Sequence, residues 1–156
     1  MKLYIRQKVF SLVDKFTVKD ASGNDIYLVA GEFLSWGKKL HVKDAYNNEV
    51  AFIQQKVISL RPKFLVFVNG LQVAEIVKEF TLFRPNYRIR GLRWEIKGNL
   101  FAYDYQITQD GTPIASIHKQ WMSWGDCYEL SIANQQDEII ALSVVLAIDC
   151  VMDQKD

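Results

Sequence analysis

The sequence predicts a mainly β (α+β) protein in which a closed antiparallel β-barrel of about ten to twelve strands surrounds one hydrophobic C-terminal helix. Three observations support this class: short alternating runs of apolar and polar residues, glycine-containing turns between them, and a segment that occurs three times at matched spacing. A closed barrel is expected because closure removes exposed strand edges. Residues 1–156 are expected to form a single domain, because this length is enough to bury one sizeable core.

Three segments of the chain are similar to one another. Residues 26–37 and 114–125 align without a gap and both end in Ser-Trp-Gly, and residues 73–83 are a third copy. A glycine precedes each copy by three residues, at Gly23, Gly70 and Gly111. A second echo relates residues 7–12 to residues 55–60. The three copies predict a repeated β unit of roughly 40–48 residues.

Each unit is expected to contain a β-hairpin. Runs rich in aromatic and β-branched residues, at Phe16–Val18, Phe64–Val68 and Phe101–Ile107, each end in turn residues. Asn-Gly and Asp-Gly between apolar runs are strong hairpin signals. The repeated segment would then be the second strand, although positions 26, 29, 33 and 36 also fit a helical stripe. Further alternating stretches predict strands at Leu40–Lys43, Tyr87–Arg90, Trp94–Lys97 and Tyr128–Ile132.

Aromatic residues recur at matched positions near the end of each repeated segment. The set comprises Phe33, Phe80 and Trp121 at one position, and Trp36, Phe83 and Trp124 at the next. These rings could stack on a ligand. Their recurrence favours core packing instead, with each repeat placing an aromatic side chain against the central helix.

The last apolar run, Ile139–Met152, predicts a buried helix. It contains no glycine or proline, does not alternate, and follows Asp137-Glu138, which suit a helix N-terminus. Its β-branched residues would also permit a central strand. A bilayer-spanning helix needs about 20 apolar residues, so this run is too short to cross a membrane. Asp149 in its last turn is expected to reach solvent or backbone donors where the helix leaves the barrel, or else to meet an arginine or a tryptophan N–H.

These features together resemble the LURP-one-related family, whose bacterial members are often called YxjI-like. That family belongs to the superfamily of Tubby C-terminal-like domains, which includes the phospholipid scramblases. The match is carried by Val73–Phe80, Trp94–Ile96, Ala102–Tyr105, Trp124-Gly125 and Ala141–Asp149, and it covers about residues 2–151. The resemblance implies a barrel of about twelve strands around a hydrophobic C-terminal helix. The phosphoinositide-binding residues of Tubby domains match no motif in this sequence, so none is carried over.

The net charge of +1 conceals an uneven distribution of charge. Residues 56–97 contain nine basic and three acidic residues, whereas residues 98–156 contain two basic and nine acidic residues. Five of the basic residues form what we term the basic stripe: Arg84, Arg88, Arg90, Arg93 and Lys97. Strand parity places most of them on one outer face of the barrel, where arginine can donate bidentately to an anion. The stripe predicts binding of a phospholipid headgroup or another phosphorylated molecule, unless it is a solvated face or is paired with acidic residues of a neighbouring strand.

No catalytic or metal motif is present. The sequence contains no G-x-S-x-G, H-E-x-x-H or P-loop, and Cys127 and Cys150 have no zinc-type spacing with His41 or His118. We therefore predict no catalytic residue, no metal ligand and no cofactor. The two cysteines are expected to be small core residues in a protein of the reducing cytosol.

The predicted function is that of a non-catalytic cytoplasmic binding module that can be peripheral at a membrane. The N-terminus lacks the apolar region of a signal peptide, no transmembrane segment is expected, and the balanced charge argues against a generic nucleic-acid binder. The first alternative is a protein-interaction scaffold whose acidic C-terminal third meets a partner. A less favoured alternative is an enzyme with an unrecognised site.

Overall fold

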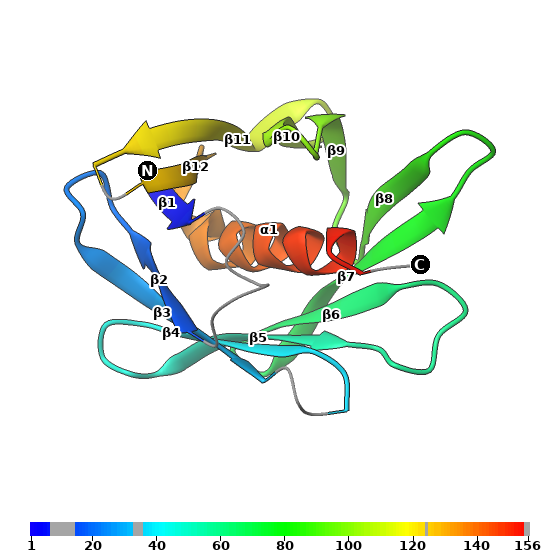
Figure 1. Cartoon of the computed structure of the whole chain (residues 1–156), viewed down its shortest axis with the longest axis horizontal. Helices are drawn as coiled ribbons and strands as arrows, with labels where there is room; N and C mark the ends of the chain where they lie inside the picture. Colours follow the sequence, from blue (N-terminus) through cyan, green and yellow to red (C-terminus); the bar gives the residue numbers. More distant parts are fainter. Residues whose placement is uncertain (7–14, 33–35, 124, 155–156) are drawn as a thin grey trace.

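A computed structural model describes residues 1–6, 15–32, 36–123 and 125–154. In this part of the chain, twelve antiparallel strands surround one α-helix (Figure 1). The strands are β1 Lys2–Arg6, β2 Lys15–Lys19, β3 Asp25–Glu32, β4 Lys39–Lys43, β5 Glu49–Gln55, β6 Lys63–Val68, β7 Leu71–Phe80, β8 Pro85–Arg90, β9 Trp94–Asn99, β10 Asp104–Gln109, β11 Thr112–Met122 and β12 Gly125–Ile132.

The strands form one sheet that curls into a nearly closed barrel. Consecutive strands pair from β1 to β8 and from β9 to β12, and β1 joins the two series by pairing with β12, from Lys2 opposite Ser131 to Arg6 opposite Cys127. The sheet order therefore begins at β8 and ends at β9, so these two strands are its edges. The predicted barrel of about twelve strands is confirmed, with one seam between β8 and β9.

The three repeats are β-hairpins. The repeated segments are the second strands of the hairpins β2–β3, β6–β7 and β10–β11, so the helical alternative is excluded. Asn69-Gly70 and Asp110-Gly111 both have positive φ angles, as a two-residue hairpin turn requires. The matched positions Val29, Ile76 and Ile117 are fully buried, so the repeat encodes the same inward position in each hairpin. The echo at residues 7–12 lies outside the described residues.

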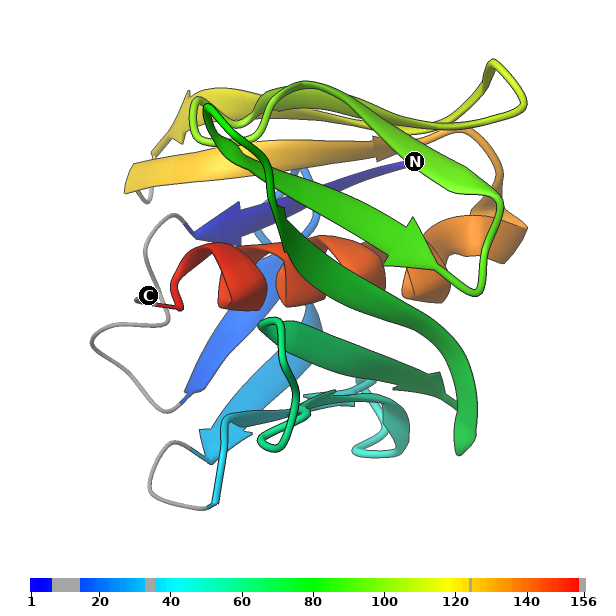
Figure 2. The same cartoon turned by 90° about the vertical axis from the view of Figure 1, so that its right-hand side faces the viewer.

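The C-terminal helix α1 (Glu138–Met152) fills the barrel, as the sequence predicts. A 3₁₀ turn at Gln135–Asp137 leads into it, and the Asn134 side chain caps that turn by accepting the Gln136 N–H. Every residue from Ala141 to Val151 is buried, because inward-facing strand residues meet the helix on all sides. Figure 2 shows α1 enclosed by the strands, with its start at one end of the barrel and its C-terminus at the other. None of the helices in the described part of the chain combines the length and apolar character needed to cross a bilayer.

The predicted packing of the repeat aromatics against the helix is wrong for the four that the structure describes. Trp36 is 78% exposed, Phe80 58%, Phe83 96% and Trp121 75%. These residues lie at or beyond the ends of their strands, whereas the smaller apolar residues within the same segments take the inward positions. Phe33 and Trp124 lie outside the described residues.

Truncating the helix inside the barrel should destabilise the protein. Leu142 is fully buried in α1, and Leu142→Ala is expected to lower the free energy of unfolding by about 2–5 kcal/mol, since it removes apolar contacts and leaves a cavity. Leu71→Ala is the matched control, because Leu71 is 72% exposed and its truncation should change stability by less than about 0.5 kcal/mol. Chemical denaturation measures both values. Equal losses in the two variants would contradict the burial described here.

Candidate functional site

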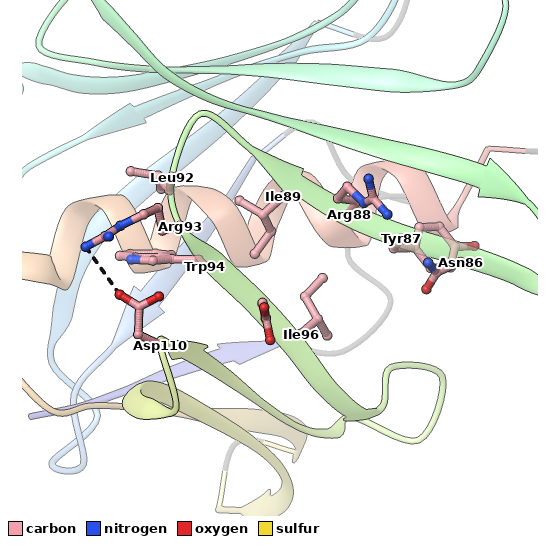
Figure 3. Close-up of a pocket in the computed structure, with 10 residues that line it drawn as sticks. Asn86, Tyr87, Arg88, Ile89, Leu92, Arg93, Trp94, Ile96 and Asp110 are labelled. Atoms are coloured by element: carbon pink, nitrogen blue, oxygen red, sulfur yellow. Dashed lines mark ion pairs between the residues drawn. The ribbon is translucent and has the colours of Figure 1, made fainter.

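A pocket of about 580 Å³ opens at the seam between β8 and β9 (Figure 3). Its wall comes from both edge strands, from the turn that joins them, and from the β10–β11 turn. The lining residues are Asn86, Tyr87, Arg88, Ile89, Leu92, Arg93, Trp94, Glu95, Ile96 and Asp110. We call this space the seam pocket.

The alternation of β8 gives the seam pocket an apolar inner wall and a polar mouth. Tyr87 and Ile89 are buried, whereas Arg88 and Arg90 on the other face of the strand are exposed. Trp94 at the start of β9 is also buried, and its indole N–H donates to Gln109 Oε1 at 3.2 Å. The sequence assigned Tyr87, Ile89 and Trp94 only to the inner face of the barrel. Their part in a pocket depends on the seam, for which the sequence has no signal.

Two members of the basic stripe share one carboxylate. Arg88 and Arg90 both reach Glu79 of β7, with nitrogen–oxygen distances of 3.6 and 3.2 Å, and Arg61 approaches the same carboxylate at 3.5 Å. The alternative of pairing with a neighbouring strand is therefore realised for these residues. Because three guanidinium groups surround one carboxylate, this face retains positive charge.

The other members of the stripe are distributed along the seam. Arg93 is in the turn between β8 and β9 and pairs with Asp110 at 3.2 Å (Figure 3). Arg84 precedes β8 at the opposite end of that strand, and Lys97 lies on β9. Within the described residues, neither Arg84 nor Lys97 has an ion-pair partner. Of the five residues of the stripe, Arg88 and Arg93 line the seam pocket, toward its two ends (Figure 3).

A second polar cluster lies inside the barrel near the C-terminal end of α1. Asp149 is buried, and its carboxylate accepts a hydrogen bond from the Tyr128 hydroxyl. The ring of Tyr103 stacks on Tyr128 at a centroid distance of 4.9 Å. The buried Tyr105 hydroxyl has no hydrogen-bond partner among the described residues. The expectation that Asp149 reaches solvent is wrong, because the last turn of the helix is still inside the barrel.

Burial is the main influence on the acidity of this cluster. It raises the pKa of Asp149 to about 7, and the hydrogen bond from Tyr128 opposes this shift only in part. Burial and the nearby Asp149 carboxylate also raise the pKa of Tyr103, Tyr105 and Tyr128. The sequence identified Asp149 as unusual, but it did not predict a tyrosine as its partner.

The cysteines and histidines, which are the other residues that could carry chemistry, do not lie together at one site. Cys127 and Cys150 are both buried and unpaired, as expected for small core residues. His41 contacts Glu32 and Glu49, and His118 lies 3.0 Å from Asp104, in each case at the exposed surface. Among the residues that the structure describes, no three His, Cys, Asp or Glu side chains are grouped as a metal site would require.

A barrel of twelve antiparallel strands around a hydrophobic C-terminal helix is the Tubby-like fold that the sequence led us to expect. The X-ray structure of an Arabidopsis thaliana protein has this fold, with a TM-score of 0.63 and 15% identity over 96% of this chain and 90% of that one. The LURP-one-related family model matches residues 1–149, and the chain belongs to this family. The uncharacterised protein YxjI of Bacillus subtilis strain 168 is 34% identical over 152 residues, which is 97% of this chain and 94% of that protein.

The buried carboxyl of Asp149 should make stability depend on pH. Its pKa is about 7 in the folded protein and about 4 in an unfolded chain, so the folded state holds a proton that the unfolded state releases between these values. The free energy of unfolding should therefore fall as the pH rises from about 4 to 7, by up to about 4 kcal/mol. Asp149→Asn keeps an acceptor for Tyr128, and it should remove this dependence and be more stable than the parent at pH 8. Denaturant titrations at several pH values measure this, and an unchanged pH dependence in the variant would contradict the assignment.

Proposed function

We propose that this protein is a non-catalytic binding module that takes a phosphate group in the seam pocket. The observation that carries the proposal is the placement of Arg88 and Arg93 around one pocket whose inner wall is aromatic and apolar. The phosphate can belong to a phospholipid headgroup or to a free phosphorylated molecule. In either case the ligand would meet guanidinium donors at the mouth and the Tyr87 and Trp94 side chains further in.

The charge around the seam pocket supports an anionic ligand. Glu79 cannot neutralise the three arginines that surround it, and Arg93 pairs with the exposed Asp110. A phosphate carries more charge than a carboxylate and offers more acceptor oxygens, so it can compete for these guanidinium groups.

Two features support a binding role in the cytoplasm rather than catalysis. The lining of the seam pocket includes no histidine, cysteine, serine or lysine, and its two carboxylates, on Glu95 and Asp110, are exposed, with Asp110 paired to Arg93. Cys127 and Cys150 are unpaired, which suits a reducing compartment.

Reversing the charges at the seam pocket should weaken phosphate binding. Isothermal titration calorimetry with inorganic pyrophosphate and with soluble dihexanoyl phosphatidylserine is expected to show binding that Arg88→Glu/Arg93→Glu weakens more than about tenfold. Lys43→Glu/Lys119→Glu is the matched control, because it makes the same change in net charge on β4 and β11, outside the pocket. Tighter binding of the lipid would point to a headgroup, and tighter binding of pyrophosphate to a free phosphorylated molecule. No binding of either probe, or equal loss in the control variant, would contradict the proposal.

A protein-interaction scaffold is the second candidate function, and the seam is the observation that favours it. The edges of β8 and β9 that face the seam have no partner strand among the described residues, and an extended peptide can pair with such an edge. Pro85 and the charged side chains of both strands are typical of edges protected from pairing, which makes this candidate the weaker one. Pull-down from the native host with Arg88→Glu/Arg90→Glu tests it, because partners retained unchanged would exclude the seam as the interface.

A further inference from the structure

The two ends of the barrel differ in how many large apolar side chains they expose. Because consecutive strands are antiparallel, the turns that follow even-numbered strands lie at one end, with the start of α1, and those that follow odd-numbered strands lie at the other, with the helix C-terminus (Figure 2). The first end is built mainly from short polar turns, at residues 20–24, 44–48, 69–70 and 110–111, and its large apolar side chains that are more than two-thirds exposed among the described residues are Tyr46 and Leu71. The Asp20 and Asp44 side chains accept backbone N–H groups within their own turns.

Among the described residues at the second end, large apolar side chains that are more than two-thirds exposed lie on four separate hairpins. They are Trp36 after β3, Ile58 and Leu60 after β5, Leu82 and Phe83 after β7, and Trp121 at the end of β11. We call these six residues the apolar rim. Each is more than two-thirds exposed, and Leu60, Leu82 and Phe83 are almost completely so. Single exposed apolar residues are ordinary, but this concentration at one end of the molecule indicates a binding surface.

The rim residues surround the end of the helix. Lys38, two residues after Trp36, pairs with Asp153 at 2.8 Å, and the Gln55 side chain at the end of β5 donates to Gln154 at 2.9 Å. These contacts anchor two of the four hairpins to the segment that follows α1. On these two hairpins, the apolar side chains therefore project from loops that are held against the C-terminal segment by side-chain contacts.

Basic residues accompany the apolar rim on two of its four hairpins, β5–β6 and β7–β8. Lys56 and Arg61 flank the turn that contains Ile58 and Leu60, and Arg84 follows Phe83 directly. Neither residues 56–62 nor residues 81–84 include an aspartate or a glutamate. Tryptophan, phenylalanine and leucine beside lysine and arginine are the residues that favour the interface of an anionic membrane.

We propose that the apolar rim inserts into the interfacial layer of an anionic lipid bilayer and docks the barrel on the membrane end-on. Side chains on four separate hairpins do not form one continuous flat patch, which a rigid partner would need to match in shape. A fluid bilayer can take up the apolar side chains of each hairpin separately, while Lys56, Arg61 and Arg84 meet lipid phosphates. The inference rests on residues other than those of the seam pocket, and it does not depend on phosphate binding there.

The test is sedimentation with vesicles of phosphatidylcholine, with and without phosphatidylserine, combined with tryptophan fluorescence. The protein is expected to bind the anionic vesicles more strongly, and the emission of Trp36 and Trp121 should shift to shorter wavelength as they leave water. Leu82→Ser/Phe83→Ser should weaken vesicle binding more than about tenfold, because two inserted side chains are lost. Both residues are almost fully exposed, so the variant should fold normally.

Tyr46→Ser/Leu71→Ser is the matched control, since it removes two exposed apolar side chains from the opposite end of the barrel. It should bind vesicles like the parent protein. Arg88→Glu/Arg93→Glu should still show the fluorescence shift at saturating vesicle concentration, whereas Leu82→Ser/Phe83→Ser should still bind pyrophosphate. This pair of results separates the rim from the seam pocket.

Three results would overturn the proposal. The first is vesicle binding by Leu82→Ser/Phe83→Ser that equals that of the parent. The second is absence of vesicle binding by the parent. The third is a parent protein that self-associates through the rim in light scattering and ignores vesicles, because a second copy of the chain would then be the occupant of this surface.

Discussion

Enclosure of α1 is the constraint on which the rest of the structure depends. The helix is apolar around its whole circumference, so a flat sheet on one side could not shield it from water. Twelve strands curl around it, and the inward residues Val29, Ile76 and Ile117 of the three repeats each supply the same position in this wall. The helix and the barrel thus form one core. The repeat is visible in the sequence because each hairpin meets the same requirement for an apolar residue facing inward.

The same constraint explains why the seam is available for binding. The pairing of β1 with β12 joins the first and last strands, and among the described residues no ladder connects β8 with β9. Both edges carry charged side chains, which discourage aggregation, and β8 also supplies Arg88 to the seam pocket. Protection of a strand edge and the proposed recognition of an anion would therefore use the same residue, Arg88.

Two features depart from the usual pattern of apolar residues inside and polar residues outside: a carboxyl group is buried within the barrel, and aromatic side chains are exposed at its surface. Asp149 lies within the barrel with Tyr128 as its donor, a costly arrangement because a buried carboxylate loses its hydration. Trp36, Phe83 and Trp121 lie in water although they belong to the most apolar part of the repeat. Both features occur at the end of the barrel where α1 terminates, which is also the end that carries the proposed membrane surface.

The sequence alone determined the class of fold, the three hairpins, the buried helix and the family, because turn residues and hydrophobic periodicity are local signals that each hairpin repeats. Arg88 and Arg90 were correctly assigned to one face by strand parity. Only the tertiary structure decided that Glu79 of the neighbouring strand β7 pairs with both arginines. It also decided that β8 and β9 leave a seam, and that the repeat aromatics project from the rim. These outcomes depend on where strands end and which strands become neighbours, and the alternation of residues along one strand contains no information about either.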